Sequence, residues 1–173
     1  LKGLDYTLQA LKILKKDFPK IHLIVIGNIK NNGHTSKLIN KLNLKDDVIF
    51  KANISKFEIN QLYASSSVAI VSSLYEGFGY PVIEAMSCEV PLIATNTSSI
   101  PELTSNYAKL IEPKNKEMIS NGVKDILLDY PKYKKIAQNG RKHIIQNFNW
   151  IKITEEYEKI ILSTIEKFKN ANF

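Results

Sequence analysis

The chain of 173 residues has little of several residue types that build specialised sites. Cys88 is the only cysteine, so an internal disulfide is impossible, and a lone thiol suits a reducing compartment. The three histidines share no metal-ligand spacing, and no Asp-x-Asp pair stands beside a strand end; they are His22, His34 and His143. Asp46-Asp47 precedes a strand and is expected to end a loop. We therefore expect no metal and no cofactor in the site.

The sequence also lacks long apolar runs, repeats and low-complexity linkers. No run reaches the roughly 18 residues that a membrane-spanning helix needs, and no signal peptide is visible. The chain starts at Leu1 without methionine, and leucines at helical spacing follow almost at once: Leu4, Leu8, Leu11 and Leu14. We expect a fragment of a larger protein. Its length suits one domain that buries roughly two-thirds of its chain surface.

Positive charge exceeds negative charge, with a net charge of +7 and a pI near 9.3. The cations form two clusters, Lys12, Lys15, Lys16 and Lys20 in one and Lys132, Lys134, Lys135, Arg141 and Lys142 in the other. Neither cluster has aromatic residues interleaved in a stacking pattern or a nucleic-acid motif, so no nucleic acid is expected as a partner. A solvated face remains open, as does attraction to an anionic inner membrane leaflet, where each nearby cation adds about 1 kcal/mol. We predict a cytoplasmic protein with a peripheral membrane contact.

Short apolar strands alternate with helices along most of the chain. The predicted strands are 21–26, 48–50, 68–71, 92–94 and 109–111. The predicted helices between them are 35–43, 56–65, 81–88 and 99–103, and three more close the chain at 116–129, 132–147 and 150–169. This alternation predicts an α/β, Rossmann-like fold with a doubly wound parallel sheet. Its ligand crevice would lie at the carboxyl ends of the strands.

The most informative segment runs from Glu76 to Glu84 and connects a buried strand to a helix. Pro81 suits a first helical position, after which Val82 opens an apolar helix face. Gly77 and Gly79 allow the backbone to approach a ligand closely, and the free amides of a helix start attract an anion such as phosphate. We therefore predict that this turn is a phosphate-binding site.

Two glutamates bracket this turn and cannot share one helical face, because Glu76 ends a strand and Glu84 lies in the helix. A carboxylate accepts two hydroxyl hydrogen bonds at once. Glu76 thus suits the hydroxyls of a sugar and Glu84 those of a ribose, with a diphosphate between them. The alternative is that both carboxylates satisfy local backbone amides at the helix start.

Several segments resemble one family of enzymes. Glu76 to Glu84 resembles the E-x7-E signature of GT4-type retaining glycosyltransferases of the GT-B fold. Three earlier segments resemble other motifs of that family: Leu1-Lys2-Gly3-Leu4-Asp5, Val25-Ile26-Gly27-Asn28 and Val48-Ile49-Phe50-Lys51-Ala52, with Ala52 replacing a usual glycine. Ile83 to Thr95 is similar to the family's EAMA-x-G-x-PVIAT segment, with Glu89 where glycine is usual. The resemblance covers nearly all of the chain in order.

The resemblance implies that residues 1–173 are the C-terminal donor-binding domain and that an N-terminal acceptor domain is absent from this chain. It implies metal-independent transfer of a hexose from a nucleotide diphosphate sugar, with retention, to a glycan or lipid-linked acceptor. Glu76 would be the catalytic residue and the last helix would cross over the missing domain. Lys2 would bind the diphosphate; the alternative is that it is a solvated terminal lysine. The other substrate-binding residues implied are Gly77, Phe78, Gly79, Tyr80, Pro81, Val82 and Glu84.

The missing part includes a strand that the family carries just before its Lys-Gly pair. That strand would be central, so we expect a gap between the inner strands of this chain or a substitute in its place. Ser98-Ser99-Ile100-Pro101-Glu102 stands where many members carry GG-x-PE. Its Ser-Ser form resembles a branch rich in lipopolysaccharide and capsule enzymes, which favours GDP-mannose over a UDP-hexose; an N-cap serine opening a short helix is the alternative.

Other functions stay open at this point. A GT-B nucleotide-sugar epimerase or a phosphorylase would share the fold and the phosphate-binding site, although the E-x7-E segment favours a transferase. A non-catalytic module that binds a nucleotide sugar would need the same phosphate-binding site but would catalyse no reaction.

Overall fold

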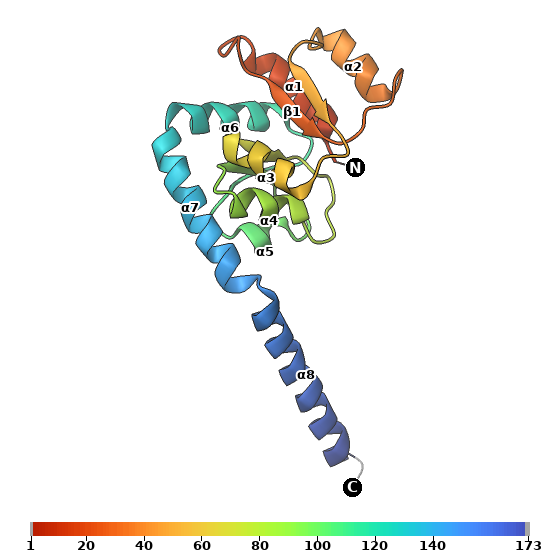
Figure 1. Ribbon diagram of the computed structural model, residues 1–173, viewed down its shortest axis with the longest axis vertical. Helices are drawn as coiled ribbons and strands as arrows, with labels where there is room; N and C mark the ends of the chain where they lie inside the picture. Colours follow the sequence, from red (N-terminus) through yellow and green to blue (C-terminus); the bar gives the residue numbers. More distant parts are fainter. Residues whose placement is uncertain (1, 172–173) are drawn as a thin grey trace.

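The computed structural model describes residues 2–171 (Figure 1). Its strands are β1 (Leu23–Ile26), β2 (Val48–Lys51), β3 (Ala69–Val71), β4 (Leu92–Thr95) and β5 (Lys109–Ile111). The first helices are α1 (Leu4–Leu14), α2 (His34–Leu42), α3 (Lys56–Ser65), α4 (Tyr80–Ser87) and α5 (Ile100–Thr104). The last three are α6 (Lys116–Leu128), α7 (Tyr130–Asn147) and α8 (Trp150–Ala171). Every predicted strand and helix is present, with small shifts at the ends.

All paired strands are parallel, as predicted, but they form two sheets rather than one continuous sheet. β1 pairs with β2, and β3, β4 and β5 form a three-stranded sheet with β4 in the middle. Among the described residues β1 and β3 are not hydrogen-bonded neighbours. The predicted gap between inner strands is confirmed.

Helices cover both faces of the three-stranded sheet, which is the doubly wound arrangement. All four residues of β4 are buried, and its side chains alternate between two apolar clusters. One cluster joins β3 and β4 to α4, α5 and α7, while the other joins β4 and β5 to α1 and α6. The sequence of such a strand is a continuous apolar run, because helices cover both of its faces.

Helix α1 links the two sheets, because different faces of it pack on each. Ala10 and Leu14 belong to the cluster against α6, whereas Leu8 and Leu11 pack with residues of α2, β1 and β2. The position of α1 therefore fixes the residues at its N-terminus relative to both sheets. The opposite face of the two-stranded sheet is open, and the side chains of Ile24, Ile26 and Ile49 are exposed there.

Helix α8 extends away from the body of the protein (Figure 1). Most of its large apolar residues are exposed, with Trp150 and Ile151 near its start and Ile161 and Phe168 further along. Among the described residues no helix is long and apolar enough to cross a bilayer.

Candidate functional site

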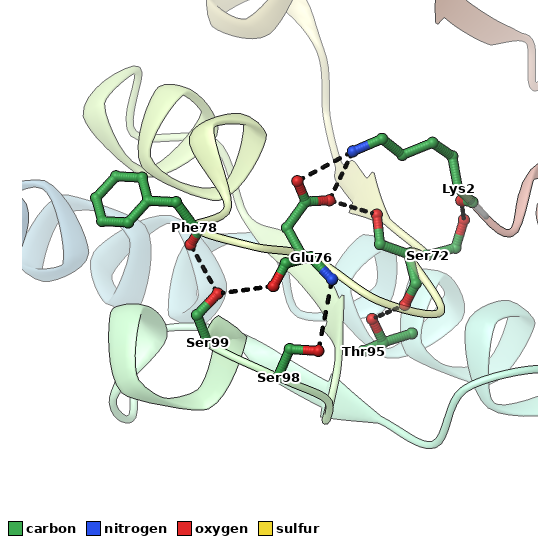
Figure 2. Close-up of polar contacts among 8 residues, drawn as sticks. Lys2, Ser72, Glu76, Phe78, Thr95, Ser98 and Ser99 are labelled. Atoms are coloured by element: carbon green, nitrogen blue, oxygen red, sulfur yellow. Dashed lines mark hydrogen bonds and ion pairs between the residues drawn. The ribbon is translucent and has the colours of Figure 1, made fainter.

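The predicted site residues lie at the carboxyl ends of β3 and β4, where a doubly wound sheet binds its ligands. The segment after β3 carries Glu76 and leads into α4, and the loop after β4 carries Ser98 and Ser99. Lys2 reaches the same place from just before α1. Figure 2 shows these three segments converging on Glu76.

Lys2 is held in place through its backbone. The hydroxyl of Ser72 donates to the carbonyl oxygen of Lys2 at 3.0 Å, and Thr7 Oγ1 donates to Ser72 Oγ at 2.9 Å. Gly3 is the N-cap residue of α1 with φ at +67°, and a Cβ there would lie 1.9 Å from the backbone oxygen of Ser72. Only glycine permits this close approach, so Gly3 fixes how the backbone of Lys2 lies against Ser72.

The side chains of Lys2 and Glu76 form an ion pair across 74 positions of sequence. Lys2 Nζ donates to both carboxylate oxygens, at 3.0 and 2.7 Å (Figure 2). Ser73 Oγ donates to Oε2 at 2.8 Å. Partial burial alone would raise the pKa of Glu76, but the hydrogen bonds from Lys2 and Ser73 and the lysine charge hold it below its ordinary value. The Lys2 side chain is 68% exposed, so solvent and a ligand can reach the ammonium group.

The turn between Glu76 and α4 presents backbone amides. Gly79 precedes α4 with φ at +103°, and Pro81 stands in the first turn of the helix. The only backbone donors to Gly79 O among the described residues are the amides of Val82 and Ile83, and no acceptor is found there for the amides of Phe78 and Tyr80. Amides at a helix start that lack a protein partner are suited to an anion.

The predicted substrate-binding residues in this turn differ in their exposure. Gly77, Phe78 and Tyr80 are exposed, and the two aromatic rings meet edge to face with centroids 5.1 Å apart. Pro81 is half-buried. Val82 has no exposed surface and its amide donates to Gly79 O, so Val82 contributes packing rather than a ligand contact.

Glu84 lies on α4 near Lys56 and Tyr63 of α3. Burial raises the pKa of Glu84, and the charge of Lys56 opposes this. Burial, with the nearby charges of Glu84 and Cys88, raises the pKa of Tyr63 to about 12. Cys88 is half-buried and its pKa is raised by burial, as expected for a packing thiol.

The capping alternative for the two glutamates does not describe this structure. Gly79 occupies the N-cap position of α4, and no side chain caps that helix among the described residues. The carboxylate of Glu76 accepts from Lys2 and Ser73, and within residues 2–171 no backbone amide of α4 donates to either glutamate side chain. Both carboxylates are therefore available for a function other than helix capping.

Three polar residues of the site were not singled out from the sequence: Ser72, Ser73 and Thr95. Ser72 and Ser73 follow β3 directly, and Thr95 Oγ1 donates to the carbonyl oxygen of Ser73 at 2.6 Å. All three side chains are buried at the strand ends. Their position at the carboxyl ends of buried strands could have identified them from the sequence, because that edge of the sheet lines the ligand crevice.

No cluster of three or more His, Cys, Asp or Glu side chains that could hold a metal ion occurs within residues 2–171. Two basic residues of α7 have local partners: Lys134 Nζ and Arg141 donate to the backbone oxygens of Glu89 and Ser87 at the end of α4.

Comparison with known proteins gives one consistent family. The model of the family described as "Glycosyl transferases group 1" matches residues 1–143. The chain is 32% identical over 169 residues to the MMP alpha-(1->4)-mannosyltransferase of Mycolicibacterium hassiacum, a match that covers 93% of this chain and 41% of the relative. The chain spans about two-fifths of the length of the curated relatives it matches, with shares of 41%, 40% and 35%.

Solved structures agree with this match. The C-terminal domain of a group 1 glycosyl transferase (LpcC) from Francisella tularensis superposes with a TM-score of 0.75 at 27% identity, covering 86% of this chain and 80% of that one. Anabaena HepE in complex with UDP-glucose gives a TM-score of 0.82 at 24% identity, covering 94% and 45%. The predicted C-terminal half of a GT-B fold is confirmed.

Proposed function

Because this chain belongs to the glycosyl transferases group 1 family, we propose that it is the donor-binding domain of a GT4-type enzyme. The enzyme transfers a hexose from a nucleotide diphosphate sugar to a glycan or lipid-linked acceptor, with retained anomeric configuration. Residues 1–173 form the donor half, and the acceptor half belongs to the rest of the protein. The chain's share of its relatives' length and the gap between β1 and β3 support this division.

The observation that carries the proposal is the cluster of Lys2, Glu76 and Ser73 beside the unpartnered amides of the turn into α4. A diphosphate bound there meets the exposed ammonium group of Lys2 and the amides of Phe78 and Tyr80. Lys2 then exchanges its carboxylate partner for phosphate oxygens. The carboxylate of Glu76 becomes free to accept hydrogen bonds from the sugar hydroxyls.

The chemistry follows from this placement. When the bond between the anomeric carbon and the diphosphate breaks, negative charge develops on the leaving oxygen. Lys2 and the turn amides stabilise this charge without a metal ion. Glu76 holds the sugar so that its anomeric carbon faces the acceptor, whose hydroxyl oxygen forms the new bond; the base for that hydroxyl comes from elsewhere.

Glu84 binds the ribose hydroxyls of the donor in this proposal. Among the described residues the carboxylate of Glu84 has no hydrogen-bonded partner, and partial burial disfavours its charged form. The ribose hydroxyls would donate the hydrogen bonds that stabilise this carboxylate. Gly77, Gly79 and Pro81 shape the turn on which the diphosphate lies.

For the donor we propose GDP-mannose, with a UDP-hexose as the second candidate. The Mycolicibacterium relative is a mannosyltransferase, which supports the first, and the Anabaena neighbour was solved with UDP-glucose, which supports the second. We further propose a cytoplasmic location with a peripheral contact to anionic lipid.

The test is calorimetric titration of the full-length protein with GDP, UDP and ADP, followed by transfer assays with GDP-mannose and UDP-glucose in the presence of EDTA. We expect one nucleoside diphosphate to bind, transfer to survive EDTA, and residues 1–173 alone to bind weakly without transferring sugar. Absence of binding by all three nucleotides would refute the donor-site assignment. Loss of transfer in EDTA would refute metal independence.

A further inference from the structure

Two consecutive serines after β4 hold the backbone of Glu76. Ser99 Oγ donates to the carbonyl oxygens of Phe78 at 2.8 Å and Glu76 at 3.3 Å, which share its single proton (Figure 2). Ser98 Oγ accepts from the amide of Glu76 at 3.5 Å. The two hydroxyls thus contact Glu76 through both its N–H and its C=O.

The hydrogen bonds with Ser98 and Ser99 restrain the backbone of the turn. Among the described residues no backbone-to-backbone hydrogen bond involves Glu76, Gly77 or Phe78. Gly77 has open space around it, with nothing within 4 Å of the position of a Cβ. A segment with so few internal contacts depends on its neighbours for its conformation. Ser98 and Ser99 are those neighbours.

The serines are themselves firmly placed. Ile100, the next residue, has no exposed surface, and Leu103 one turn later is also buried in the core cluster beneath α4. Ser99 stands at the N-cap position of α5, yet its side chain makes no capping hydrogen bond. Its hydroxyl is therefore used across the site rather than on its own helix.

We propose that Ser99, assisted by Ser98, is a positioning residue that holds Glu76 where its carboxylate meets Lys2, Ser73 and the donor sugar. The part concerning the sugar rests on the proposed function. The part concerning Lys2 and Ser73 rests on the ligand-free geometry alone. In family members that carry glycines at these two positions, no hydroxyl is present there, so other contacts must fix the conformation of the turn.

The test compares wild type with Ser99→Ala, Ser99→Thr and the control Ser163→Ala in the full-length protein. Ser163 is an exposed serine on α8 that bonds only to its own helix among the described residues. The first measurement is the pKa of Glu76 in the ligand-free protein, by NMR of carboxyl carbons, with Glu76→Gln identifying the signal. The second is the affinity ratio of GDP-mannose to GDP, and of UDP-glucose to UDP.

If Ser99 positions Glu76, Ser99→Ala moves the pKa of Glu76 upward toward its ordinary value, because the carboxylate loses alignment with Lys2 and Ser73. The same variant reduces the sugar-dependent affinity ratio by roughly threefold to tenfold, the loss of about one hydrogen bond. Binding of the bare nucleoside diphosphate falls less than binding of the nucleotide sugar, because Ser72, and not Ser99, holds the backbone of Lys2. Ser99→Thr restores both values, and Ser163→Ala changes neither.

Two results would overturn the inference. One is an unchanged pKa of Glu76 and an unchanged affinity ratio in Ser99→Ala. The other is an equal loss of nucleoside diphosphate and nucleotide-sugar binding, which indicates a general structural role. If Ser99→Ala does not fold, Ser98→Ala is measured in the same way, with a smaller shift expected. If wild type binds no nucleotide sugar, the proposed function fails, and the pKa measurement alone decides the role of Ser99.

Discussion

Replacement of Gly79 by alanine tests how the turn into α4 is built. Gly79 has φ at +103°, a backbone conformation that residues with a side chain rarely adopt. A Cβ at this position would also lie 2.7 Å from Cδ1 of Leu103. Leu103 is 2% exposed and packed in the core, so its side chain has little room to move away. The substitution therefore strains the backbone and crowds the core together.

Both costs can be estimated from these contacts. A left-handed conformation costs an L-residue about 1–2 kcal/mol, and an extra methyl group in a packed core costs about 1–3 kcal/mol. Gly79→Ala should therefore lower the free energy of unfolding by about 2–5 kcal/mol. For a domain of this size that corresponds to a fall in Tm of roughly 4–20 °C.

The measurement is thermal and urea unfolding of the full-length protein, with Gly77→Ala as the matched control in the same turn. Gly77 has no positive φ and open space at its Cβ position, so its substitution should change the free energy of unfolding by about 0.5 kcal/mol or less. Leu103→Ala provides a second check, because removing the crowded side chain should make Gly79→Ala less costly in the double variant. Equal stability of Gly79→Ala and Gly77→Ala would refute the reasoning.

Three further predictions concern charge and capping. Glu84→Gln should weaken nucleoside diphosphate binding about tenfold or more, the value of a charge-assisted hydrogen bond, while Tm stays level or rises because a partly buried carboxylate is removed; a lower Tm with intact binding, by calorimetry, would contradict this. Glu76→Gln should spare binding of the bare nucleoside diphosphate and mainly reduce sugar transfer. The pKa of Glu76 is depressed on folding, so its ion pair with Lys2 stabilises the protein above the ordinary value of 4.5. The stability difference between wild type and Glu76→Gln should narrow as pH falls below that value, and a constant difference would argue against the pair. Ser55→Ala should cost about 0.5–2 kcal/mol in urea unfolding, because it removes the capping box with Glu58 on α3, and an unchanged midpoint would contradict it.

The order and type of the secondary structure were readable from the sequence because local patterns determine them. β4 is a continuous apolar run because both faces are covered, and the structure places it in the centre of its sheet. Pro81 marks the start of α4 as predicted. Glu89, which stands where glycine is usual in the related motif, has φ at +56°, so the glycine preference reflects a left-handed backbone at the end of α4.

The tertiary structure decided how the site residues meet. The sequence placed Lys2 on a diphosphate and Glu76 on a sugar, but the ligand-free protein joins the two directly, because α1 packs against both sheets and brings Lys2 to the end of β3. Ser98 and Ser99 lie 22 and 23 positions after Glu76 in the sequence, and their hydrogen bonds to its backbone correspond to no periodic pattern in the chain. Periodicity and turn chemistry act over a few residues, so they specify elements. Contacts between elements depend on how the core packs, and only the folded chain determines them.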